Sequence, residues 1–157
     1  MGTPLDLQLG RWPVTIEMPV QWGDMDALGH VNNLIYLRWC ESARIAYFEA
    51  GGLWARRDEG IGPILASTRL DYKLALTYPD AIRAATTVLK LGRTSITMGM
   101  RIRSKKHERA IVAEGEAILV MVSYATGEKH DLGAELRRRI VDLEAGAPQP
   151  GELKADA

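Results

Sequence analysis

Apolar and polar residues alternate in several stretches of this chain, and one stretch follows a helical period instead. Apolar side chains occupy every second position over residues 14–22, which predicts a half-buried strand. Helical spacing then covers residues 33–50, with an N-cap at Asn32 or Asn33 and the Gly51-Gly52 pair as the stop. Because this helix is apolar on more than one side, we expect other elements to enclose it.

The remainder of the chain is predicted to be mostly strand. Alternating patterns cover residues 64–74, 81–91, 95–103 and 110–123, and the tight turns between them indicate antiparallel pairing. A short helix is expected over residues 134–144. A strand, a long helix and then four strands predict an α+β fold in which an antiparallel sheet of about five strands wraps around one helix.

This pattern also predicts the domain limits and a partner. We expect residues 1–144 to form a single domain and residues 145–157 to be a flexible tail. Four apolar side chains are expected on the outer face of the sheet: Leu89, Leu91, Leu119 and Met121. An apolar outer face needs a covering surface, so the chain is predicted to form a homo-oligomer, either a dimer or a tetramer of dimers.

Composition narrows the class of protein. Of 157 residues, 46% are hydrophobic and 25% are charged, and the formal net charge is zero. No overall field therefore favours nucleic acid, and no apolar run is long enough to predict a membrane span. The single cysteine and a start without the basic and apolar regions of a signal peptide are typical of a cytoplasmic protein.

The loop over residues 22–33 concentrates polar chemistry between the first strand and the long helix. It contains two aspartates, a glycine at position 29, His30 and two asparagines. A plain connection does not need that many polar groups. Free N–H groups at a helix start polarise a carbonyl, and a carboxylate beside them is suited to transferring an acyl group to water.

The residues of this loop also resemble the motif of a known protein family. Gly-Asp-Met-Asp-Ala-Leu-Gly-His-Val-Asn-Asn, followed by Tyr-Leu-Arg-Trp and Glu-Ser-Ala-Arg, resembles the hot-dog fold acyl-CoA thioesterases, most of all the 4-hydroxybenzoyl-CoA thioesterase branch. The resemblance implies that Asp26 attacks the thioester carbonyl or activates a water. It also implies that the backbone N–H near Asn33 stabilises the oxyanion. Gly29 would let the backbone pass close to the acyl group.

Each loop residue also has a structural interpretation. Asp24 and Asp26 can hold the loop through Asx turns. His30 can act as a general base, since its ordinary pKa lies near neutrality, or it can position the loop. Asn32 is first of all a helix cap, and a contact of its amide with substrate is secondary.

The long helix offers a rival catalyst. Glu41 lies on it, and a sister class of hot-dog thioesterases uses an acidic residue on this helix. The structural alternative is a buried ion pair with Arg38 or Arg44. Tyr36 is expected to pack in the core or line the acyl pocket, and Cys40 is expected to be a small buried residue and not a nucleophile.

Phosphates of coenzyme A need cations. Lys90, Arg93 and Ser95 flank a predicted hairpin at the position where related thioesterases bind the nucleotide part of CoA, and the alternative is an ordinary solvated turn. Weaker candidates are Arg69, Lys73 and the arginines at 137–139. His30, His107 and His130 are widely spaced, so no metal site is predicted.

The sequence therefore predicts a hydrolase that cleaves an acyl-CoA to free acid and CoA without metal or cofactor. Three alternatives stay open: an acyl-ACP thioesterase, a non-catalytic acyl-CoA-binding protein and a hydratase-type hot-dog enzyme. The last is disfavoured by the loop motif, because hydratases of this fold have a different Asp/His motif.

Overall fold

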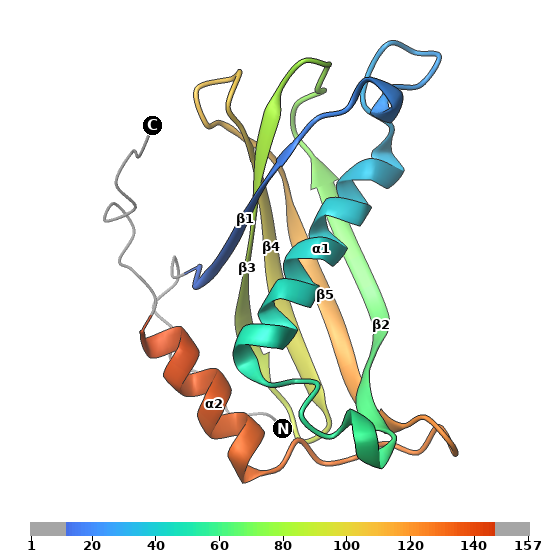
Figure 1. Ribbon diagram of the computed structural model, residues 1–157, viewed down its shortest axis with the longest axis vertical. Coiled ribbons are helices and arrows are strands. Elements are labelled where there is room, and N and C mark those ends of the chain that lie inside the picture. Colours follow the sequence, from blue (N-terminus) through green and yellow to red (C-terminus); the bar gives the residue numbers. More distant parts are fainter. Residues whose placement is uncertain (1–11, 147–157) are drawn as a thin grey trace.

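A computed structural model describes residues 12–146, and it confirms the predicted α+β hot-dog arrangement (Figure 1). The long helix α1 lies across one face of an antiparallel sheet, and a second helix lies beside one edge. The elements in chain order are β1 Val14–Pro19, η1 Trp22–Asp24, α1 Asn33–Gly51, η2 Arg57–Glu59, β2 Ile61–Tyr72, β3 Ala81–Leu91, β4 Ser95–Ser104, β5 Ile111–Ser123 and α2 Ala134–Ala145. The predicted tail beyond residue 146 lies outside the described residues.

The five strands pair in the order β1-β3-β4-β5-β2, and all four pairings are antiparallel. β1 and β2 are therefore the two edges. The first predicted strand is shorter than its pattern suggested, because the chain turns into η1 and leaves Trp22 75% exposed. The helix limits agree closely with the sequence: Asn32 is the N-cap of α1, and Gly52 ends it in the left-handed conformation with φ 73°.

The core fills the space between α1 and the concave face of the sheet. The helix buries one side, with Tyr36, Trp39, Ala43 and Tyr47 all at most 3% exposed. On another side, Leu34 is 64% exposed. We expected other elements to enclose the helix. Within a single chain, they cover only one side of it.

The strand faces required two corrections. Leu91, Leu119 and Met121, expected on the outer face, are buried in the core. On β5 the small residues Ala113 and Ala117 share that inner face, and their size disguised it in the sequence. On β2 an irregularity between Leu65 and Ser67 shifts the register, so the predicted alternation does not keep one face along the whole strand.

Helix α2 closes the core at the edge of the sheet formed by β1 and β3. Among residues 12–146, β1 pairs with β3 only as far as Thr86, so beyond that point β3 has a strand partner on its β4 side alone. Glu144 of α2 is fully buried and supplies acceptors here: Val88 N donates to it at 2.6 Å, Thr87 Oγ1 at 2.8 Å and Tyr47 Oη at 2.7 Å. One carboxyl group thus joins α2, β3 and α1.

Candidate functional site

The loop between β1 and α1 folds back on itself as a compact turn. Met25 and Val31 form an isolated antiparallel bridge, and Asp26 N donates to His30 O at 2.9 Å. Gly29 has φ 79°, a left-handed conformation that favours glycine, and its N–H donates to Asp26 O at 3.0 Å. A Cβ built at Gly29 would meet no atom within 4 Å, so backbone conformation and not crowding accounts for this glycine within the chain.

Asp24 holds the base of this loop. Its side chain is only 4% exposed, and both carboxylate oxygens are used: Gln21 N donates to Oδ2 at 2.8 Å and Arg38 Nη2 donates to Oδ1 at 3.0 Å. Its main-chain carbonyl accepts from Asn32 N at 2.9 Å. The structure therefore supports the loop-holding interpretation of Asp24.

Asp26 is half-buried and has one oxygen committed. Leu28 N donates to its Oδ1 at 2.8 Å, which is the Asx turn that the sequence offered as the structural alternative. Within residues 12–146, no hydrogen bond or ion pair engages Oδ2. The carboxylate does not line the cavity described below, although one of its oxygens is available to a ligand.

The first amide of α1 is also uncommitted. Asn32 Oδ1 accepts from Leu34 N at 2.9 Å, and Asn32 O accepts from Ile35 N at 2.9 Å. In the described part of the chain, Asn33 N has no hydrogen-bond partner. An open N–H at the positive end of a 19-residue helix is suited to an oxygen that gains negative charge.

A cavity of about 290 Å³ lies beside this helix start. It is lined by Val31, Asn33, Tyr36, Tyr72, Lys73, Leu74 and Ala75. Tyr36 Oη donates to Leu74 O at 3.2 Å, Tyr72 Oη donates to Asn33 O at 3.3 Å, and the two rings meet edge to face at 5.2 Å. Aromatic walls beside a polar helix end suit a ligand with an apolar body and a carbonyl group.

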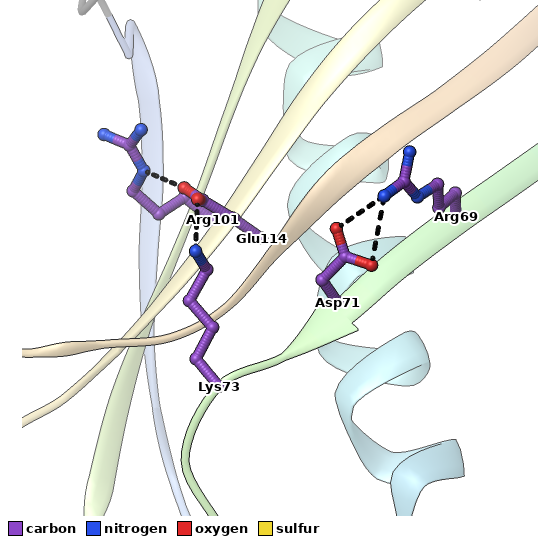
Figure 2. Close-up of polar contacts among 5 residues, drawn as sticks. All are labelled: Arg69, Asp71, Lys73, Arg101 and Glu114. Carbon is purple, nitrogen blue, oxygen red and sulfur yellow. Dashed lines mark hydrogen bonds and ion pairs between the residues drawn. The ribbon is translucent and has the colours of Figure 1, made fainter.

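The cation at the cavity, Lys73, already has a carboxylate partner. Figure 2 shows Lys73 and Arg101 converging on Glu114: Lys73 Nζ lies 2.8 Å from Oε1 and Arg101 Nε lies 3.3 Å from Oε2. The hydrogen bond from Lys73 is the main cause that lowers the pKa of Glu114 below its ordinary value. On β2, which ends one residue before Lys73, Arg69 pairs with Asp71 at 3.1 Å. Of the weaker candidates for phosphate binding, Lys73 and Arg69 therefore have carboxylate partners.

The hairpin expected to bind CoA lies at the other end of the molecule. Lys90, Arg93 and Ser95 flank the β3–β4 turn, whereas the loop with Asp26 follows the opposite end of β1 (Figure 1). Helix α1, whose length is about 28 Å at 1.5 Å per residue, separates the two regions. Within one chain the structure does not bring these cations to Asp26.

Two other candidates, Glu41 and His30, do not line this cavity. Glu41 is exposed, and no ion pair in residues 12–146 includes it, so the predicted buried pair with Arg38 or Arg44 is wrong. Arg38 turns to Asp24, and the buried Arg44 donates to the sulfur of Met100 at 3.3 Å. His30 is exposed at the tip of the loop.

Cys40 is buried in the core, where desolvation raises the pKa of its thiol to about 11. A thiol this far from ionisation is a poor nucleophile at neutral pH. Over residues 12–146, no group of three or more His, Cys, Asp and Glu side chains is placed to hold a metal ion. No helix in that range is long and apolar enough to cross a membrane.

Residues 20–147 match the model of the thioesterase-like superfamily. The chain belongs to this family. The PA2801 protein from Pseudomonas aeruginosa has a similar structure, with a TM-score of 0.74, 28% sequence identity, and coverage of 83% of this chain and 99% of that one. No curated protein matches the sequence.

Two further relatives have this fold. A thioesterase from Thermus thermophilus, in complex with coenzyme A and Zn, is 28% identical with a TM-score of 0.74, and the match covers 87% of this chain and 98% of that one. The DHNA-CoA thioesterase from Staphylococcus aureus is 20% identical with a TM-score of 0.75, covering 84% of this chain and 91% of that one, a level that shows the fold alone.

Sequence reasoning missed two contributors to this region. Tyr72 falls within the strand predicted over residues 64–74, but which turn of α1 it meets depends on the pairing of β2 with β5. The pair of Asp24 with Arg38 spans 14 positions, and no local pattern in the sequence indicates it.

Proposed function

We propose that this thioesterase-family protein hydrolyses an acyl-CoA to a free acid and CoA. The observation that carries the proposal is the uncommitted N–H of Asn33 at the start of α1, beside an aromatic cavity. Asp26, with its unpaired Oδ2, lies in the loop that leads into this helix. A carboxylate and an oxyanion donor are the two groups that thioester hydrolysis needs.

The chemistry follows from these two groups. Asp26 removes a proton from a water, whose oxygen adds to the thioester carbonyl carbon, and the carbonyl oxygen then carries the negative charge. The N–H of Asn33 donates to that oxygen. The tetrahedral intermediate collapses, the C–S bond breaks, and the departing thiolate of CoA takes up the proton. Alternatively, Asp26 attacks directly and forms an anhydride, which water then hydrolyses.

We propose that a second copy of the chain completes the CoA site. Support comes from the edge strand β2, where Ile64 is 44% and Leu65 46% exposed, and from the uncovered side of α1. A two-fold copy that pairs β2 with β2 in antiparallel fashion would bring the β3–β4 turn of one chain toward the loop of the other. In such a dimer, Lys90 and Arg93 of one chain would meet the CoA phosphates at the other chain's Asp26.

The proposal is tested by thiol release from short, long and aromatic acyl-CoAs, with matched substitutions at one position. Asn33→Pro deletes the proposed donor N–H, and proline is well tolerated at the first position of a helix. The N-cap Asn32, with φ −61° and ψ 139°, already has the extended conformation that a residue before proline requires. Asn33→Ala keeps the N–H and removes only the side chain.

We expect Asn33→Pro to lower kcat by about 10²–10³-fold, and Asn33→Ala to lose far less. Equal losses in the two variants would show that the side chain matters and the amide does not. Tight acyl-CoA binding by the wild-type protein with no thiol released would instead favour a non-catalytic acyl-CoA-binding protein.

A further inference from the structure

We infer that Asp24 and Arg38 are a positioning pair, which fixes the loop of Asp26 relative to the first amide of α1. The inference rests on the proposed function for its catalytic meaning, but its structural content stands on contacts alone. Neither residue lines the cavity at the helix start, so the pair acts through its neighbours and not on substrate.

Asp24 is the point where three separate segments meet. Gln21, two residues beyond β1, donates to its Oδ2 at 2.8 Å, and Arg38, more than one turn into α1, donates to its Oδ1 at 3.0 Å. The carbonyl of Asp24 accepts from the N–H of the helix cap Asn32 at 2.9 Å. One residue therefore connects the segment that follows β1, the helix cap and the body of the helix.

These contacts leave the loop few ways to move. Between Asp24 and Asn32 the chain closes through the Met25–Val31 bridge and the bond from Asp26 N to His30 O at 2.9 Å. With its base fixed to α1, the backbone of Asp26 has a defined position relative to Asn33 N. If the base is released, the turn can shift as a unit against the helix while its internal bonds survive.

The charges explain why the pair is needed. Asp24 is only 4% exposed, and a buried carboxylate needs a partner, whereas the side chain of Arg38 is 56% exposed and keeps contact with water. Without Arg38, the carboxylate of Asp24 would gain by turning toward solvent. That movement would break the bond from Gln21 N to the carboxylate, and the base of the loop, including the bond from Asn32 N to the Asp24 carbonyl, would open more often.

The test uses four variants: Arg38→Met, Arg38→Lys, Asp24→Asn and the double variant Arg38→Met/Asp24→Asn. The control variant is Arg56→Met. Arg56 is a matched control, because it pairs with Glu59 at 2.9 Å on the surface near η2, in the segment that follows α1. Each variant is assayed for acyl-CoA hydrolysis per mole of folded protein, and the exchange rate of the Asn32 amide is measured by NMR.

We expect Arg38→Met to lower kcat by about 10²-fold with little change in KM, because misplacing a reacting group by about 1 Å has an effect of that size. Arg38→Lys restores a charged donor and should recover most of the loss. The double variant should lose no more than the worse single variant, because the two residues act as one unit. The Asn32 amide should exchange at least about tenfold faster in Arg38→Met, since local opening sets that rate, and Arg56→Met should change neither quantity.

Unchanged exchange at Asn32 in Arg38→Met overturns the inference, whatever the activity does. Faster exchange with normal kcat, or no recovery in Arg38→Lys, also overturns it. If the wild-type protein hydrolyses no thioester, the proposed function fails, and the exchange rates alone then decide whether the pair holds the loop.

Discussion

The two ends of helix α1 satisfy their polar groups in opposite ways. At the carboxyl end, the buried carboxyl group of Glu144 accepts from Tyr47, Thr87 and Val88. At the amino end, Asn33 N and Asp26 Oδ2 have no partner among the described residues. The same helix thus begins among open groups and ends among paired ones.

Exposure explains the difference. A buried polar group without a partner costs about 1–3 kcal/mol, so the buried groups around Glu144 must be paired. Groups that water can reach cost little when left open, and they stay available to a substrate. Full pairing therefore indicates a structural role for Glu144, and the open groups indicate where chemistry is expected.

The largest expected effect is on turnover at the open end. Asp26→Asn should lower kcat by about 10²–10⁴-fold, the usual contribution of a catalytic base, while the unfolding transition moves little. Thiol-release kinetics and urea unfolding of the same preparation measure the two quantities. Near-normal turnover in this variant would remove Asp26 from the mechanism.

Substitution of Glu144, near the carboxyl end of α1, should lower the free energy of unfolding and leave turnover unchanged. Glu144→Leu leaves three donors without an acceptor, and we expect a loss of about 3 kcal/mol in the free energy of unfolding. Activity per mole of folded protein should not change. Glu135→Gln serves as the control, because Glu135 forms an exposed pair with Arg139 that contributes about 0.3–0.5 kcal/mol.

A smaller effect concerns pH. Burial raises the pKa of Glu144 above its ordinary value of 4.5, so the folded protein holds this proton more tightly than the unfolded chain. Its contribution to stability is therefore complete below pH 4.5 and is lost as pH rises through the folded pKa. The unfolding free energies of the wild type and Glu144→Gln are measured across this range. The value for the wild type minus the value for the variant should fall with rising pH. If the wild-type value minus the variant value rises with pH, the expected direction is wrong.

The smallest effect is expected in the middle of the helix. Because the pKa of Cys40 is raised to about 11, only about one thousandth of the thiol is ionised at pH 8. A thiol reagent should modify the native protein far more slowly than the urea-unfolded chain, and Cys40→Ala should leave kcat unchanged. Rapid labelling of the native protein that abolishes activity would reverse this conclusion.

Local patterns predicted most of the elements but not their contacts. The glycines after α1 and the asparagine before it marked the helix ends, because caps depend on neighbouring residues. The inner face of β5 was misassigned because alanines at 113 and 117 disguise it. Glu41 was expected to be buried, but the sheet covers only one side of α1 and leaves it exposed.

The sequence by itself determined the order of the elements, the helix limits, and the loop where two aspartates precede a helix start. Each depends on residues that are close together in the chain. Only the tertiary structure decided that Arg38 pairs with Asp24 and not Glu41, that Glu144 closes the sheet edge beyond β1, and that Lys90 and Arg93 lie at the end remote from Asp26. Those outcomes depend on strand register and on which side of a helix the sheet covers, and residues distant in sequence set both.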